Sequence, residues 1–374
     1  MSGIYGGRGL TAASGSGAIL RDEEGKEYLD FYCGSGAALF GHSHPVLVQA
    51  LVKASESPWT IGIGMDSKVR AALKGSLEEL LPGHSVFYCN SGTEAIEAAL
   101  KLAVSLRPGR KKLLALRRAF HGRTLGALSL TFNPQYRKEW AHLLPDVQHV
   151  KPEELPDLID ADTAAVFVEP IQGEGGVYPL SPSLGARITE SCHKADALLV
   201  CDEIQAGWGR CGAFSASSLV GLEPDILCFA KGVAGGLPIG LTLWKKNLGD
   251  FSPSGHGSTY GGNPLVLAIA EASLRLLTTE ALPSHAARSG TFFRELLGKI
   301  DSPLISEVRG MGLLNGVELT IKAVPIIKRM QDKGVLVLPA GPSVVRFLPP
   351  FVAVEEDFER AAAVFKEALE EEGS

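Results

Sequence analysis

The amino-acid sequence predicts an α/β protein with a large domain on a mostly parallel central sheet and a smaller α+β domain formed by both chain ends. Between about residues 84 and 275, short apolar runs alternate with helical patterns. This alternation is typical of a parallel sheet covered by helices. The two chain ends carry shorter strands and helices in a different order. A chain of 374 residues is also long enough for more than one domain.

The expected elements of the large domain follow from local patterns in chain order. Ser85–Cys89 has a strand pattern, and Asn90-Ser-Gly-Thr opens an apolar-periodic helix at 94–106. Further buried strands are expected at Lys112–Leu116, Ala164–Val168, Ala197–Cys201, Ile226–Phe229 and Ile239–Trp244. A helix is expected at Leu184–Ala195, and another begins near Pro264.

The small domain is expected to combine both ends of the chain. Residues 18–33 form two extended runs around the polar turn at 22–27, which predicts a hairpin. Toward the C-terminus, helices are expected at Pro283–Ile300, Ala323–Lys333 and Glu355–Glu370, and strands at Leu313–Leu319 and Val335–Leu338. We therefore expect residues 1–40 to join residues 281–374 in the small domain, while residues 41–280 form the large domain.

Composition excludes several classes of protein. The formal net charge of −6 provides no basic surface for nucleic acid or an anionic membrane. No apolar stretch approaches the roughly 20 residues that a membrane span needs, and the first residues lack the apolar core of a secretory signal. The six cysteines form no C-x-x-C pair, and His42-Ser-His44 has no partner at metal spacing. We expect a soluble, cytoplasmic protein with reduced cysteines and no metal.

Two of the predicted strands end on residues that can carry chemistry. Ile226–Phe229 is followed by Ala230 and then by Lys231 at the start of a glycine-rich turn, and Ala197–Cys201 is followed directly by Asp202. A lysine and an acid at the ends of neighbouring buried strands fit a pyridoxal 5′-phosphate enzyme. The lysine forms a Schiff base with this cofactor, and the acid pairs with the protonated pyridine nitrogen.

Two further motifs predict phosphate contacts. Asn90-Ser-Gly-Thr-Glu94 lies where a strand gives way to a helix, and free N–H groups at a helix start attract phosphate. Gly255–Pro264 places hydroxyls and glycines before another helix. A simple N-cap is the structural alternative for the first motif, because serine and threonine caps are common.

Other motifs predict contacts to a flat cofactor and to carboxylates. Phe120 can stack on a ring, and Arg123 can bind a carboxylate with its two-pronged guanidinium group. Glycines around Glu174 allow that residue to approach a ligand, and Arg346 lies in an apolar run where it needs an anion. The structural alternatives are a core phenylalanine, a surface arginine and an exposed turn glutamate. His121, between these residues, is predicted to be structural.

In this order, the motifs resemble those of class III aminotransferases of fold type I, most closely the acetylornithine aminotransferase family. The resemblance runs from about Gly17 to Phe358. The matching segments are Asn90–Ala95, Phe120–Thr124, Glu169–Gly176, Asp202–Gln205 and Ser258–Thr259. It implies an aminotransferase that uses pyridoxal 5′-phosphate.

The resemblance also implies a set of cofactor contacts. They are Ser91, Gly92, Thr93, Phe120, Asp202, Glu203, Ile204, Gln205, Lys231 and Thr259. Within this set, Lys231 and Asp202 are the catalytic residues, Gln205 lies near the phenolic oxygen of the ring, and Phe120 stacks on it. Thr259 reaches the phosphate of the neighbouring subunit, so a homodimer with shared active sites is expected.

Four residues are implied to bind substrate. Arg123 binds the α-carboxylate of an acylated diamine, with Ser258 close by. Arg346 binds the α-carboxylate of glutamate and pairs with Glu174 when glutamate is absent. Lys231, once displaced by substrate, is placed to move a proton between the substrate and the cofactor.

The predicted reaction moves the terminal amino group of an N-acylated basic amino acid to 2-oxoglutarate, giving a semialdehyde and glutamate. N-acetylornithine in arginine biosynthesis is the leading substrate, followed by succinyl-diaminopimelate or another acylated diamine, with lysine biosynthesis as the alternative pathway. Ser35 stands where ornithine aminotransferases have a tyrosine, which argues against free ornithine. One alternative is a 4-aminobutyrate-type or other ω-aminotransferase, against which Ser258 argues because that group tends to have glycine there. The other is a non-catalytic regulator of the same fold, which would be expected to lack Lys231 or Asp202.

Overall fold

The computed structural model describes residues 7–62 and 64–373, and its larger lobe is built around one mixed sheet. The strand order in this sheet is β4-β12-β11-β10-β7-β5-β6. The bounds are β4 His84–Cys89, β12 Gly240–Lys245, β11 Ile226–Phe229, β10 Leu198–Asp202, β7 Thr163–Val168, β5 Lys112–Leu116 and β6 Gln148–Val150. Strand β12 is antiparallel to both of its neighbours, whereas the pairs among β11, β10, β7, β5 and β6 are parallel. The predicted mostly parallel sheet is confirmed.

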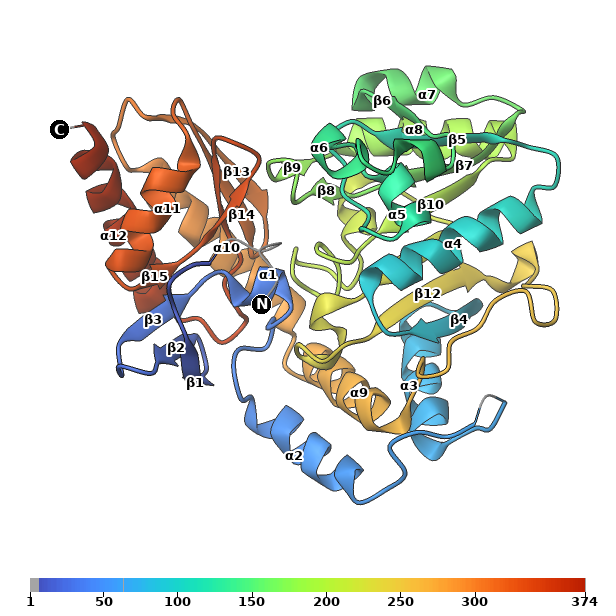
Figure 1. The fold of residues 1–374 in the computed structure, drawn as a ribbon, viewed down its shortest axis with the longest axis horizontal. Coiled ribbons are helices and arrows are strands. Elements are labelled where there is room, and N and C mark those ends of the chain that lie inside the picture. The colour runs from blue at the N-terminus through green and yellow to red at the C-terminus, as the bar shows by residue number, and fades with distance from the viewer. Residues whose placement is uncertain (1–6, 63, 374) are drawn as a thin grey trace.

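Helices cover this sheet because its central strands are apolar on both faces. Every residue of β7 and β10 is buried, as expected for a parallel sheet between layers of helices. The helices of this lobe are α2 Pro45–Ser55, α3 Lys68–Leu80, α4 Gly92–Leu106, α5 Leu125–Leu130, α6 Pro134–Arg137, α7 Leu155–Leu158, α8 Pro182–Ala195 and α9 Pro264–Thr279. In Figure 1, α7 and α8 lie at the top of the larger lobe and α9 and α3 at its bottom.

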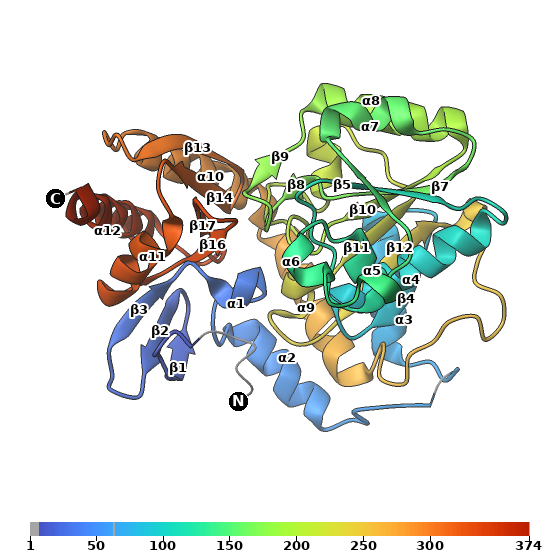
Figure 2. The same ribbon diagram turned by 45° about the horizontal axis from the view of Figure 1, so that its top comes forward.

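The smaller lobe combines the two ends of the chain. Its antiparallel sheet has the order β13-β14-β17-β16, and a second sheet has the order β1-β2-β3-β15. The bounds are β1 Ala12–Ser16, β2 Ile19–Asp22, β3 Glu27–Asp30, β13 Ile305–Met311, β14 Leu314–Leu319, β15 Val335–Leu336, β16 Leu338–Ala340 and β17 Val344–Phe347, with helices α1 Cys33–Gly36, α10 Leu282–Gly298, α11 Ala323–Asp332 and α12 Glu355–Gly373. Because β15 pairs in parallel with β3, the blue and red ends of the ribbon lie side by side (Figures 1 and 2). The predicted hairpin at 22–27 is confirmed by the pairing of β2 with β3.

One predicted strand is wrong. Residues 335–338 do not form a single strand, because Val335–Leu336 pairs with β3 while Leu338–Ala340 pairs with β17 in the other sheet. The chain therefore changes sheets at Val337. The domain boundaries at residues 40 and 280 stay a prediction, and residues 1–6 of the expected N-terminal segment lie outside the described residues. Within the described part of the chain, no helix has the length and apolar character to cross a membrane.

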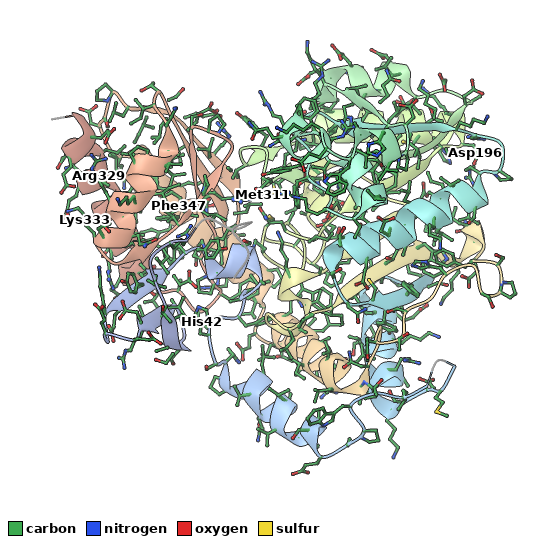
Figure 3. The ribbon with its side chains drawn as sticks, viewed as in Figure 1. His42, Asp196, Met311, Arg329, Lys333 and Phe347 are labelled. Carbon is green, nitrogen blue, oxygen red and sulfur yellow. The ribbon has the colours of Figure 1, made fainter. Side chains whose placement is uncertain are left out.

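The two lobes meet at a short hairpin of the larger lobe. Strands β8 Ile171–Gln172 and β9 Tyr178–Pro179 pair with each other, and β9 contacts β13. Figure 2 shows β9 between the main body of the larger lobe and the sheet of the smaller one. Met311, at the end of β13, lies at the same boundary (Figure 3). The loop between β8 and β9 carries Glu174, so one predicted site residue lies where the lobes meet.

Candidate active site

Lys231 and Asp202 lie at the carboxyl ends of adjacent parallel strands. In the register between β10 and β11, Asp202 faces Cys228, and Lys231 follows three residues later at the turn after β11. Lys231 has φ +49°, a left-handed conformation that is uncommon for a residue with a side chain. Asp202 is buried. The strand topology thus brings together the lysine and the acid that the sequence singles out.

The surroundings of Lys231 favour its neutral form. Burial lowers the pKa of this amine to about 8, and the positive charge of Arg346 acts in the same direction. The carboxylates of Glu174, Asp202 and Glu169 oppose the shift. Near neutral pH the unprotonated amine, the form that acts as a nucleophile or a base, is therefore more populated than in a free lysine.

Asp202 is held by two partners. Its Oδ2 lies 2.8 Å from Nδ1 of His121, and its Oδ1 accepts a hydrogen bond of 3.0 Å from the backbone N–H of Ile204. Burial works to lower the pKa of His121, but the hydrogen bond and charge of Asp202 outweigh it, so the net shift is upward. Nδ1 of His121 can therefore donate a hydrogen bond to the carboxylate of Asp202. The sequence predicts a structural role for His121, and its contact with Asp202 appears only when its loop packs against β10.

Arg346 is a buried cation with a carboxylate partner. Its Nη2 donates to Oε2 of Glu174 at 2.7 Å and to the carbonyl of Pro339 at 3.3 Å. Its Nη1 donates to Oε1 of Gln205 at 2.8 Å. The Arg346 side chain is 2% exposed, whereas that of Glu174 is 39% exposed. The cation is therefore fixed, and its carboxylate partner has room to move.

Gln205 is oriented by the same contact. Because its carbonyl oxygen accepts from Arg346, its amide NH2 is left to donate hydrogen bonds. That arrangement suits a group that must donate to a phenolic oxygen of a cofactor. Gly173 lies against this amide, since a Cβ there would come within 1.9 Å of the Gln205 oxygen.

The predicted phosphate motif caps helix α4. Ser91 is the N-cap, and its side chain accepts from the N–H of Glu94. Gly92 allows Ile204 to pack against the backbone, because a Cβ would lie 2.9 Å from the Ile204 side chain. The hydroxyl of Thr93 lies 2.8 Å from that of Thr124. The first N–H groups of this helix have no acceptor within it and can bind an anion.

Phe120 and Arg123 lie on the loop after β5. The backbone N–H of Phe120 donates to the buried carboxylate of Glu169 at 2.9 Å. The guanidinium of Arg123 lies 3.4 Å from the ring centre of Tyr136 and 5.7 Å from that of Phe120. Among the described residues, no ion pair involves Arg123, so its charge is available to a ligand carboxylate. Tyr136 was not singled out from the sequence, since an isolated aromatic residue provides no motif.

The carboxylate of Glu203 is bonded within the protein. Its carboxylate is buried and accepts hydrogen bonds from Ser215 Oγ, Ala216 N and both the N–H and hydroxyl of Ser217, between 2.5 and 2.9 Å. These donors lie in the segment after the Gly207–Gly212 turns. These contacts stabilise the segment that carries the donors, and a contact of Glu203 with cofactor stays a prediction.

Ser258 and Thr259 lie on an exposed loop. Ser258 Oγ accepts from Asn90 Nδ2 and from the N–H of Gly261, both at 3.0 Å. Thr259 is exposed and lines a surface hollow of about 350 Å³ together with Asn90 and Glu94. Thr259 is exposed, whereas Lys231 is only partly exposed, and this difference is consistent with a residue that acts on another subunit. Within residues 7–62 and 64–373, no group of three or more acidic, histidine or cysteine side chains is arranged to hold a metal.

Comparisons with known proteins extend over nearly the whole chain. The model of the family described as Aminotransferase class-III matches residues 8–369. The chain is 40% identical over 377 residues to the LysW-aminoadipate semialdehyde transaminase of Deinococcus radiodurans, covering 98% of this chain and 88% of that protein. It is 38% identical over 377 residues to the acetylornithine aminotransferase of Clostridium acetobutylicum, covering 98% and 97%. The solved structure of the Toxoplasma gondii ornithine aminotransferase, reported with partial occupancy of PLP, is 31% identical with a TM-score of 0.93, covering 100% and 92%.

Proposed function

The chain belongs to the class III aminotransferases, which use pyridoxal 5′-phosphate, and we propose that it moves the terminal amino group of an N-acylated basic amino acid to 2-oxoglutarate. The two products are a semialdehyde and glutamate. N-acetylornithine is the leading amino donor. The proposal agrees with the names of two relatives, which specify acetylornithine or an aminoadipate semialdehyde.

The ion pair between Arg346 and Glu174 is the observation that carries this proposal. Such an enzyme must bind glutamate, which brings a carboxylate to the reacting end, and then an amine that has none there. A buried arginine without an anion is costly, so an amine would meet an unfavourable site if Arg346 were bare. The half-exposed Glu174 neutralises Arg346 for the amine and can withdraw when a substrate carboxylate takes its place.

The remaining site residues fit the cofactor. When bound, pyridoxal 5′-phosphate supplies an electron sink that stabilises negative charge at the substrate carbon. Asp202, held by His121, is suited to hold the ring nitrogen in its protonated form, and the free amide of Gln205 is suited to donate to the phenolic oxygen. Lys231, with its lowered pKa, is suited to take and return the proton at the substrate carbon.

The N-acylated substrate class is supported by Arg123. This arginine stacks on Tyr136 and has no ion-pair partner in the described part of the chain, so it is suited to hold the distant α-carboxylate of the amine. We expect Arg123→Ala to raise KM for N-acetylornithine by roughly tenfold or more, as for a lost charged hydrogen bond, and to change KM for glutamate little. Equal losses with both substrates would contradict this role.

Single-turnover spectroscopy tests the substrate class directly. The purified holoenzyme is mixed with N-acetylornithine, N-acetyllysine, free ornithine or 4-aminobutyrate, and the loss of the cofactor absorbance is followed. We expect rapid conversion by the acetylated amines and slow conversion by free ornithine. Rapid conversion by 4-aminobutyrate alone would retain the aminotransferase chemistry and overturn the proposed donor. Faster conversion by N-acetyllysine than by N-acetylornithine would identify the longer-chain amine as the preferred substrate.

A homodimer with shared sites is part of the proposal. It is supported by the exposed position of Thr259 and by the exposed apolar side chains of Trp59, Met65 and Tyr260, which are 62%, 62% and 65% exposed. Asp66, which follows Met65 in the chain, lines the same surface hollow as Thr259. Large exposed apolar side chains are typical of an interface between subunits.

A further inference from the structure

Two arginines and a glycine lie in one row across the antiparallel sheet of the smaller lobe. Arg309 of β13 faces Gly316 of β14, and Gly316 faces Arg346 of β17. Directly paired residues point to the same face of a sheet, and neighbouring strands are roughly 4.8 Å apart. The two arginines are therefore about 10 Å apart at the backbone and are directed to one face. Phe347, next to Arg346, lies within the smaller lobe in Figure 3.

The segment of residues 173–177, here called the switch loop, lies across this row. Arg346 binds the side chain of Glu174 near its beginning, with Nη2 2.7 Å from Oε2. Val177, at its end, sits over Gly316, because a Cβ on Gly316 would lie 2.9 Å from Cβ and Cγ2 of Val177. Because Gly316 has no side chain, it leaves space that Val177 of the switch loop fills.

Arg309 holds the end of the switch loop through its backbone. Its Nη2 donates to the carbonyl of Gly176 at 2.7 Å, and its Nε donates to the carbonyls of Gly176 and Val177 at 2.9 and 3.2 Å. Its charge is balanced within its own sheet by Glu307 at 2.6 Å and Glu318 at 2.5 Å. These contacts do not involve any substrate group, so they persist in both halves of a transamination cycle.

Aromatic packing reinforces the same anchor. The guanidinium of Arg309 lies 3.9 Å from the ring centre of Tyr178, the residue that follows the switch loop, and the hydroxyl of Tyr178 donates to Glu318 at 3.1 Å. The guanidinium of Arg118 of the larger lobe also lies over this ring, at 4.5 Å. The end of the switch loop is therefore fixed to both lobes.

We propose that Arg309 is a positioning residue that fixes the switch loop at the distance from which Glu174 reaches Arg346. One arginine of the row is an anchor for main-chain oxygens, and the other exchanges its carboxylate partner between Glu174 and substrate. The inference rests on the proposed function, because the expected effect of this geometry is on the choice between the amine substrate and glutamate. No role in proton transfer or cofactor binding is assigned to Arg309.

The test compares the two half-reactions in single turnover. The measured quantity is the ratio of kcat/KM for N-acetylornithine to kcat/KM for glutamate. Arg309→Lys keeps a charge beside Glu307 and Glu318 but cannot donate to two carbonyls in the arginine geometry. We expect this ratio to fall about tenfold, because one charged hydrogen bond between Glu174 and Arg346 loses its geometry.

The matched control is Arg329→Lys, the same substitution on α11 in the same lobe (Figure 3), where the arginine pairs with Glu372. It should leave the ratio unchanged. A second route avoids Arg309. Gly316→Ala displaces Val177 and should lower the ratio, and the added substitution Val177→Gly, which removes the Cβ that the new methyl group meets, should restore it. This route keeps the test valid if Arg309→Lys fails to fold.

The Glu174→Ala background separates the possible outcomes. Glu174→Ala itself should lower the ratio, and Arg309→Lys should then cause no further fall. Equal losses in both half-reactions, or a full further loss in the Glu174→Ala background, would show that Arg309 is only structural and would overturn the inference. If Glu174→Ala leaves the ratio unchanged, the role of Glu174 in the proposed function is wrong, and the inference is overturned with it.

Discussion

At the scale of single residues, the charge state of Lys231 is the property with the most direct consequence. Because burial and Arg346 lower the pKa of this amine to about 8, its neutral fraction rises as pH passes through that value. We expect the rate of cofactor uptake by cofactor-free protein, followed by visible absorbance, to rise between about pH 7 and 9. Arg346→Leu removes a positive charge near Lys231, so the midpoint should move to higher pH. A rise that occurs only near the usual pKa of free lysine would contradict the assignment.

His121 provides a second prediction at this scale. His121→Phe removes the donor at 2.8 Å from Asp202 and leaves one carboxylate oxygen buried without that partner. We expect kcat to fall by roughly tenfold or more, as when a charged hydrogen bond is lost. His121→Asn can still donate a hydrogen bond and should recover part of the activity. Similar activity in His121→Phe and the unchanged protein would mean that the histidine only fills space.

At the scale of elements, substitutions of Glu203 distinguish a role in protein stability from a role in cofactor binding. Its carboxylate accepts from four groups in Ser215–Ser217. Glu203→Ala leaves these donors unpaired, and the free energy of unfolding should fall by about 2–4 kcal/mol. Glu203→Gln keeps one acceptor and should lose less. Thermal unfolding and the cofactor spectrum are measured together. A loss of cofactor affinity at unchanged stability would place Glu203 in the cofactor-binding set.

The sequence predicts strands best where one local pattern decides the outcome. The apolar runs that became β7 and β10 are buried on both faces, so their composition identifies them. Residues 335–338 resemble one strand in the sequence because both halves are apolar. They belong to two sheets only because β3 and β17 lie on different sides of them in the fold. Local composition does not contain that information.

The same limit applies to the candidate site. Lys231 and Asp202 could be predicted because each ends an apolar strand, and the parallel register brings such ends together. The contacts of His121 with Asp202 and of Arg309 with the carbonyl of Gly176 could not be predicted, since the two residues of each pair are distant in sequence. The partners of Glu203 could not be predicted either, because its carboxylate is bonded to the segment Ser215–Ser217, which lies more than ten residues further along the chain.

At the scale of the whole molecule, the subunit arrangement decides whether each active site is complete. Thr259 is exposed on a loop attached to Asn90 through Ser258, and Tyr260 beside it is largely exposed as well. If Thr259 contacts the phosphate bound by a second subunit, each site combines Lys231 of one chain with Thr259 of the other. A symmetric dimer then contains two such sites.

Mixed dimers test this arrangement without a structure of the complex. Two differently tagged chains are co-expressed, and dimers that carry both tags are isolated. With Lys231→Ala in one chain and Thr259→Asp in the other, one site of the mixed dimer retains both native residues, so about half of the wild-type activity is expected. With both substitutions in one chain and none in the other, each site has one defect, and little activity is expected. The reverse result would mean that Thr259 serves the site of its own chain. Dimers of each single variant are the controls, since both should be inactive: one lacks the lysine, and the other places a carboxylate against the phosphate.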